Sequence, residues 1–210
     1  MLLKEAVDNL AYRLGKSDDE PFKERLTRDV SVARGEILRR EINKKSKVSA
    51  SHSNSLTGLE VIESNLPYEN PTPSKKKVWR TKEKIPRPLM YHDQNPGFIF
   101  VGGVDYVTAH QYVVPERMSR RTTHFKDEQY YTYFDDYIFF FDNIKFCSIR
   151  AIFGDIIAAA NVKNASGTVC IPEIIISDEL FTGMKRLLLE EENEMSLRYK
   201  PEVEVNVDQS

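Results

Sequence analysis

Apolar residues near the start of the chain recur at helical spacing, and this pattern predicts two amphipathic helices. The first helix is expected to end at Gly15, and its apolar face consists of Leu3, Ala6, Val7, Leu10 and Leu14. The second is expected to begin after Asp18 or Asp19 and to reach Lys44, with Pro21 in its first turn. Its single apolar stripe consists of Phe22, Leu26, Val30, Ala33 and Ile37.

From Gly97 onward the pattern changes to aromatic and β-branched runs separated by turn-forming residues, which predicts strands. The expected strands span 98–101, 106–114, 130–134, 137–141 and 144–153. The last three runs are divided by Asp135-Asp136 and Asp142-Asn143, so they predict an antiparallel meander. In the third of these runs both faces are apolar, and we therefore expect it in the interior of the sheet.

Two further helices are predicted after the strands. A short helix is expected at 156–160, and Ser177-Asp178-Glu179 is a signal for the start of a longer one. The apolar stripe of this closing helix consists of Leu180, Met184, Leu187 and Leu188. Together the elements predict an α+β fold in which the N-terminal helix pair and the C-terminal helix pack with the antiparallel meander.

Residues 48–96 are predicted to form an extended, Pro-rich arm or insertion. Ser, Lys, His and Asn dominate 46–55, a strand is expected to start near Leu59 and end at Pro67, and prolines then interrupt a basic segment. In this interpretation 1–47 and 97–198 form one domain, and 199–210 is an acidic tail. The tail is either disordered or donated to a neighbour as an edge strand.

The composition is that of a globular protein that leans polar, with 40% hydrophobic and 30% charged residues. Because no apolar run approaches the ~18 residues that a bilayer span needs, and because the first residues lack the pattern of a secretory signal, we expect no membrane association. The net charge of −2 argues against a dedicated nucleic-acid binder. Basic residues nevertheless collect in 21–47 and 75–87, and acidic ones after Glu190, which favours either contacts between copies or solvated helix ends.

Candidate chemistry is sparse. His52, His92, His110 and His124 are isolated in sequence, and Asp135-Asp136 fits a hairpin turn better than a metal-binding pair. Cys147 and Cys170 are too few for a disulfide framework and are interpreted as two buried thiols in a reducing compartment. The sequence therefore predicts no catalytic residue, no cofactor and no metal ion, and the protein is not expected to be an enzyme.

The candidate interaction residues lie in the predicted arm: Lys75, Lys76, Lys77, Trp79 and Arg80. The lysines could contact phosphates while Trp79 stacks on a base, or the same segment could pin the arm into a protein groove. Because no folded recognition element surrounds the segment, protein docking is favoured over nucleic-acid binding.

Two parts of the chain resemble small virion proteins of tailed bacteriophages. The first is the opening Leu-Leu-Lys-Glu-Ala-Val-Asp-Asn-Leu-Ala-Tyr-Arg-Leu-Gly with the basic helix after it. The second is Ile-Arg-Ala-Ile-Phe-Gly-Asp at 149–155, Ile-Pro-Glu-Ile at 171–174 and the closing helix with Leu-Leu-Leu-Glu-Glu-Glu. These segments are similar to head-to-tail connector proteins, the neck or ring proteins, most like those of crAss-like podoviruses.

The resemblance implies a structural virion protein of the head-to-tail connector that catalyses no reaction. Its partners would be copies of itself in a homo-oligomeric ring, the portal protein and neighbouring neck and tail proteins, with phage DNA passing through the lumen. It would reside at the head-tail junction of the virion and be assembled in the host cytoplasm. The alternative is a nucleic-acid-binding accessory or assembly protein that uses the basic arm, and salt-dependent DNA binding by the free chain would favour it.

Overall fold

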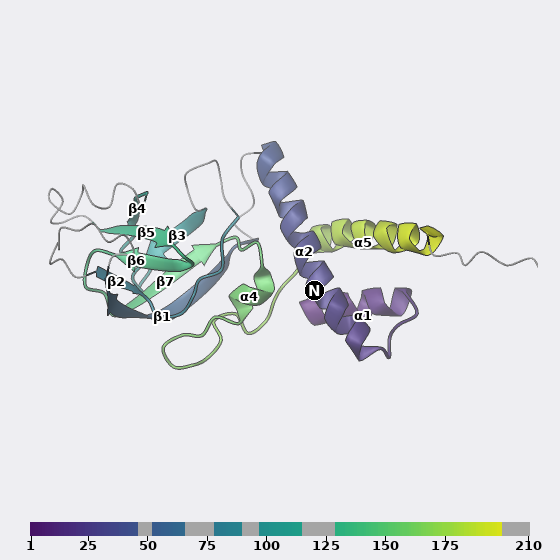
Figure 1. Cartoon of the computed structure of the whole chain (residues 1–210), viewed down its shortest axis with the longest axis horizontal. Helices are drawn as coiled ribbons and strands as arrows, with labels where there is room; N and C mark the ends of the chain where they lie inside the picture. The colour runs from purple at the N-terminus through teal and green to yellow at the C-terminus, as the bar shows by residue number, and fades with distance from the viewer. Residues whose placement is uncertain (46–51, 66–77, 90–96, 115–128, 199–210) are drawn as a thin grey trace, which may run out of the picture.

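The computed structural model describes residues 1–45, 52–65, 78–89, 97–114 and 129–198. These residues form two units that lie end to end, a helical unit and a rolled seven-stranded sheet (Figure 1). The predicted α+β class is confirmed. The helices are α1 (Leu3–Arg13), α2 (Glu20–Lys45) and α5 (Asp178–Arg198) in the helical unit, and the short α4 (Ile156–Ala160) between the two units.

Capping side chains mark the starts of α2 and α5, and a glycine follows the end of α1. The Asp19 carboxylate accepts a hydrogen bond from the Phe22 amide at 2.9 Å, which makes Asp19, not Asp18, the residue that caps α2. The Ser177 hydroxyl accepts from the Leu180 amide at 3.3 Å and caps α5 in the same way. After α1, Gly15 adopts φ of 68°, a left-handed conformation that glycine allows at a helix end.

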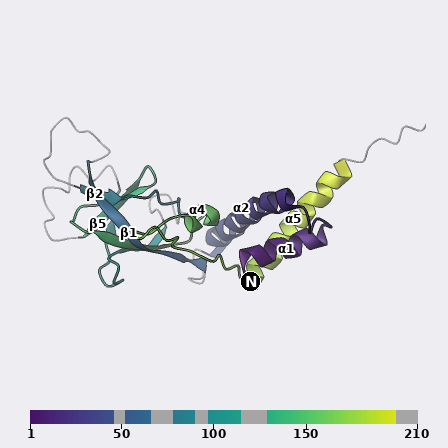
Figure 2. The same cartoon turned by 90° about the horizontal axis from the view of Figure 1, so that it is seen from below.

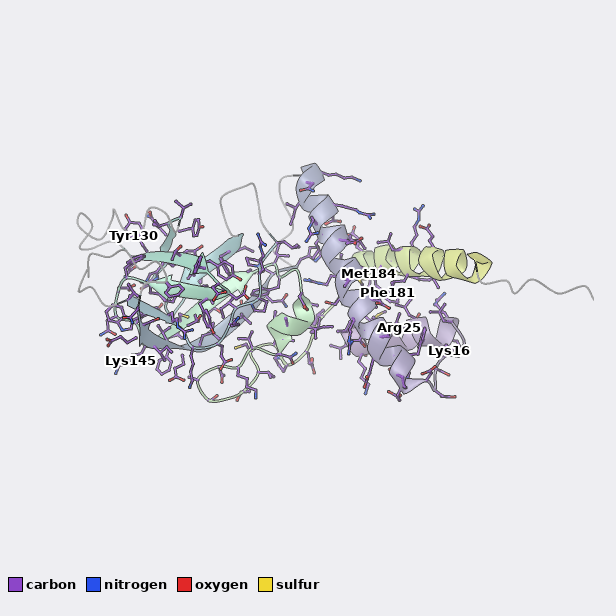
Figure 3. The ribbon with its side chains drawn as sticks, viewed as in Figure 1. Lys16, Arg25, Tyr130, Lys145, Phe181 and Met184 are labelled. Atoms are coloured by element: carbon purple, nitrogen blue, oxygen red, sulfur yellow. The ribbon has the colours of Figure 1, made fainter. Side chains whose placement is uncertain are left out.

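The three long helices bury their apolar stripes against one another. Both α1 and α5 pack on α2, and Figure 2 shows the three helices together, away from the sheet. Phe181 and Met184 of α5 lie where this helix meets α2 (Figure 3). Gly183 permits this approach, because a Cβ atom there would lie 3.1 Å from Cδ1 of Ile37. The fully or almost fully buried side chains include Ala6, Leu10, Val30, Leu38, Ile176 and Met184.

The sheet has the strand order β3-β7-β1-β2-β6-β5-β4. Neighbouring strands are antiparallel except β4 and β5, which are parallel. The strands are β1 (Asn54–Ser64), β2 (Val78–Thr81), β3 (Phe98–Gly102), β4 (Gln111–Tyr112), β5 (Tyr130–Phe134), β6 (Tyr137–Phe140) and β7 (Phe146–Ala151).

The predicted meander is correct for its first two strands and wrong for the third. β5 and β6 form a hairpin, and Asp135 and Asp136 both have positive φ, 50° and 63°, as a two-residue turn of this kind requires. β7 does not pair with β6, because β2 and β1 lie between them. β7 is nevertheless an interior strand, flanked by β3 and β1, as its two apolar faces predicted. The run 106–114, expected as one strand, contributes only Gln111–Tyr112.

The described parts of the predicted arm, 52–65 and 78–89, belong to the core instead. β1 and β2 pair with each other inside the sheet, and Leu56, Leu59 and Ile85 are almost completely buried. Burial of these side chains stabilises the strands although prolines flank them, which local propensity alone did not indicate. The remaining parts of that segment, 66–77 and 90–96, and the predicted acidic tail lie outside the described residues.

The sheet rolls until its two edges meet. The backbone of Ala109, just before β4, bridges to Gly102 of β3, and the His110 amide donates to the Val101 carbonyl at 2.8 Å. Inside the roll, the Phe98 ring of β3 packs edge to face on Tyr131 and Tyr133 of β5, with centroids 6.0 and 5.3 Å apart. Strands from opposite ends of the strand order therefore share one apolar core.

Arg34 and Gly35 of α2 join the two units. Arg34 is 2% exposed, and its guanidinium donates to the Phe153 carbonyl at 3.0 Å and to the His52 carbonyl at 3.2 Å. A Cβ atom at Gly35 would lie only 2.9 Å from the Gly154 carbonyl oxygen, so only glycine lets α2 come this close. Burial lowers the pKa of Arg34 to about 10, and the group stays charged at neutral pH.

Candidate protein-interaction surface

Two of the five predicted interaction residues lie within the described chain. Trp79 is in β2, where it pairs with Glu63 and Phe140 and packs, partly buried, on the core of the roll. Arg80 places its guanidinium 4.0 Å from the centroid of the Tyr137 ring, a cation–π contact. Both side chains thus support the sheet. Lys75, Lys76 and Lys77 lie outside the described residues, and their interaction role stays a prediction.

His110 forms a polar contact that sequence reasoning missed. Its Nε2 lies 2.9 and 3.0 Å from the two carboxylate oxygens of Asp142, and its ring packs edge to face on Phe140 with centroids 5.2 Å apart. The His110 side chain is completely buried, and Nδ1 has no hydrogen-bond partner in the described structure. The His110 amide also donates to Val101 of β3, and Asp142 follows β6. His110 therefore connects the edge strand β3 to the end of β6 where the sheet closes. Only the tertiary structure brings positions 110 and 142 together.

The other candidate groups do not converge on a site. His52 is partly buried at the joint, where burial lowers its pKa, while His92 and His124 lie outside the described residues. Asp136 accepts a hydrogen bond from the Tyr133 hydroxyl at 3.1 Å within the hairpin. Among the residues that the structure describes, no group of three or more His, Cys, Asp or Glu is placed to hold a metal ion.

The two cysteines are free thiols, as expected, but differ in exposure. Cys147 is buried and Cys170 is half-buried, so the prediction of two buried thiols is correct for Cys147 only. Burial raises the pKa of both thiols above the ordinary value and keeps them protonated at neutral pH. Such thiols are weak nucleophiles, which agrees with a packing role.

The loop Gly102–Thr108, called here the valine loop, is tightly built. The Gly103 amide donates to the Thr108 carbonyl at 3.0 Å, and an Asp105 carboxylate oxygen accepts from the Val107 amide at 3.1 Å. A Cβ atom at Gly102 would collide with the Thr108 carbonyl oxygen, so the loop can close only over glycine. These contacts fix the backbone, yet the loop exposes 47% of Val104 and 82% of Val107.

Tyr106 is the strained residue of the valine loop. Its φ of 58° is rare for an aromatic residue and costs roughly 1–3 kcal/mol, so other contacts must hold it in place. The Tyr106 hydroxyl is 2.8 Å from the Thr57 hydroxyl of β1, and its ring lies 5.1 Å from that of Phe100 of β3. Strain maintained by specific contacts is typical of functional segments.

Strand register shows where the Tyr106 ring lies. Ser148 of β7 pairs with Gly102, and β7 runs between β3 and β1, so a ring that touches both neighbours crosses over Ser148. The Ser148 hydroxyl is accordingly buried and has no partner in the described structure. Two residues earlier on the same face of β7 is Phe146, 45% exposed and next to Lys145, which is labelled in Figure 3.

Val104, Tyr106, Val107 and Phe146 form what we call the sheet patch. Each of these residues exposes between 41% and 82% of its surface. Contiguous exposed apolar and aromatic side chains mark protein–protein contact sites. The sequence carried a partial signal: Asp105 two residues before Val107 and the pair Gly102-Gly103 both favour a turn, whereas the run 106–114 was interpreted as a strand.

Comparison with known proteins agrees with a contact role. A family model described as phage tail ring protein 2 matches residues 5–209. No curated protein matches the chain. Within the described residues, no helix is both long and apolar enough to cross a bilayer. The match spans almost the whole sequence and confirms the resemblance noted above, so the chain belongs to the phage tail ring protein 2 family of crAss-like phages.

Proposed function

We propose that the chain is a structural virion protein of the head-to-tail connector, where it forms part of a ring between the portal and the tail. The observation that carries the proposal is the family match over residues 5–209, which identifies a phage tail ring protein. The joint at Arg34 and the exposed sheet patch support it, because a ring subunit needs rigidity and outward-facing contact surface.

The proposed partners are copies of the same chain, the portal protein and the adjoining neck and tail proteins. An elongated chain with two units (Figure 1) can contact neighbours around a ring with one unit and neighbours along the tail axis with the other. Phage DNA would pass through the lumen. Trp79 packs on the core of the roll, so base stacking by this residue is disfavoured and the proposed partners are proteins.

Imaging of the purified chain, alone and mixed with the portal protein, tests the proposal. Closed rings that bind the portal are the expected result. A chain that neither self-associates nor binds portal or tail components would contradict it. A DNA titration at several salt concentrations, with the triple variant Lys75→Ala, Lys76→Ala, Lys77→Ala as control, separates out the nucleic-acid alternative. Tight, salt-sensitive binding that the triple variant loses would favour that alternative.

A further inference from the structure

We propose that neighbouring copies associate head to tail, with the sheet patch of one copy on the exposed face of α2 of the next. This inference rests on the proposed function and names the surfaces that would close the ring. One surface lies on the sheet and is apolar and aromatic, and the other lies on α2 and is rich in arginine.

The first surface is the sheet patch. It is apolar and aromatic, and Asp105, in the middle of the valine loop, is the one charged residue of that loop. The hydrogen bonds of Asp105 and the Tyr106–Thr57 contact hold the loop in one conformation before any partner arrives. A preorganised loop loses little conformational entropy on binding, which favours its use as a contact.

The second surface is a stripe on α2 that we call the arginine stripe. At helical spacing it carries Arg25, Arg28, Val32, Glu36 and Arg39. Val32, at its centre, is 63% exposed, whereas Arg34 on the opposite side of the helix is buried at the joint. Glu36 pairs with Arg40 at 3.6 Å, while Arg28 and Arg39 are exposed and have no partner among the described residues. Arg25 lies over the Phe22 ring of the same helix, 5.0 Å from its centroid. Val32, Arg28 and Arg39 are left exposed.

The two surfaces complement each other in charge and apolar character. The stripe presents an exposed valine between arginines, and the valine loop presents exposed valines around an aspartate. Lys145 is exposed next to Phe146, so the complementary charge of the patch comes from the valine loop alone. Arginine stems can also cover the aromatic rings of Tyr106 and Phe146.

Two-fold self-pairing of the patch is disfavoured, because it would bring two Asp105 carboxylates together. Contact between two different surfaces of identical chains is heterologous, and heterologous contacts generate rings when the rotation closes. A second copy of this chain is thus the occupant that both surfaces fit.

The experiment uses the full chain and measures assembly against concentration by light scattering, with electron microscopy of the products. Val107→Asp should raise the concentration for half-assembly about tenfold or more. Asp105→Arg should do the same, as should the double variant Arg28→Asp, Arg39→Asp. Combining Asp105→Arg with that double variant should recover part of the lost assembly, because the charges are exchanged across the contact while the hydrogen bonds of Asp105 within the loop stay lost.

Ile175→Asp is the matched control, since Ile175 is 70% exposed and lies on neither surface. It should assemble like wild type, and circular dichroism checks that every variant is folded. Rings that form equally well from all patch and stripe variants overturn this inference while leaving the proposed function intact. Loss of portal binding by the patch variants with unchanged self-assembly also overturns it. A wild-type chain that never self-associates overturns it as well, and the portal mixture then judges the proposed function separately.

Discussion

The helical unit and the rolled sheet bury their apolar side chains through contacts of different range. α1 and α2 are neighbours in sequence, and a single stripe on each of the three long helices makes the core of that unit. In the sheet, β1 pairs with β7 and β2 with β6, so most pairings join distant segments. The helical unit thus depends on local order plus one docked helix, whereas the sheet has to assemble as a whole.

The two units also differ in their buried polar atoms. The described side-chain nitrogen and oxygen atoms that are buried without a hydrogen-bond partner all lie in or beside the sheet: Asn54 Oδ1, His110 Nδ1, Thr132 Oγ1 and Ser148 Oγ. His110 lies where the edges of the sheet meet, and Ser148 lies beneath the valine loop. Buried polar atoms without a partner cost stability. The helical unit has none among these described side-chain atoms, so this cost falls on the sheet.

Phe140→Ala should have the largest effect and should test whether the sheet unfolds as a whole. Phe140 is completely buried and contacts both Trp79 and His110, so the variant should lose about 3–5 kcal/mol of unfolding free energy. Urea denaturation should follow Trp79 fluorescence, since the chain has one tryptophan, together with helix circular dichroism. A large fluorescence shift with a small change in helix signal would show that the units unfold separately, and equal shifts would show one cooperative molecule.

Arg34→Ala should sharpen the comparison by weakening the joint. It removes the donor to the Phe153 and His52 carbonyls, and leaving such buried acceptors without this partner costs about 2 kcal/mol. We expect the fluorescence and circular dichroism transitions to move apart. Glu24→Ala, on the same helix but exposed and outside the arginine stripe, is the control and should leave both midpoints unchanged. Coincident transitions in the Arg34 variant would refute the role of Arg34 as the link.

High pH should destabilise the sheet more than the helical unit. Burial, helped by nearby Tyr112, raises the pKa of Tyr131, so the folded state keeps a proton that the unfolded chain releases above pH 10. Stability from this group is complete below pH 10 and falls above it, by about 1.4 kcal/mol per pH unit. Tyr131→Phe should flatten the decline in the fluorescence-monitored free energy. An unchanged slope would mean that other groups govern alkaline unfolding.

Asp19→Ala should have the smallest effect and act on the helical unit alone. Loss of the cap on α2 should cost about 1 kcal/mol, seen mainly in the circular dichroism midpoint. Asp18→Ala is the matched control and should change little, since the Phe22 amide bonds to Asp19. Equal effects of the two substitutions would argue against a specific cap.

The elements predicted correctly are those whose signals are local. Gly15, the capping Asp19 and Ser177, and the apolar stripes fixed α1, α2 and α5 within a few residues, and Asp135-Asp136 identified the hairpin. The beginning of β1 was interpreted as a loop because Asn54 and Ser55 belong to the polar run 46–55. In the structure these polar residues precede Leu56, which is buried on the inner side of the sheet.

Strand order and the contact surface could not be predicted, because both depend on tertiary structure. Nothing in the spacing of the runs indicates that β1 and β2 separate β6 from β7. Charge and aromatic content drew attention to Trp79 and Arg80, which the structure packs on the sheet. The sheet patch can be identified only from the exposed fraction of each side chain. Val107 and Val101 are both valines, yet the first is exposed and the second is buried.

The meeting of the sheet edges has a consequence for a protein held at high local concentration. A long open strand would be a template on which further chains could add without limit. Here the Val101 carbonyl and the Gly103 amide are already bonded within the chain, and an irregularity at Ile99 interrupts the rest of β3. Crowded copies are therefore left to recognise one another by side chains, and an assembly of defined size can form without fibrous growth.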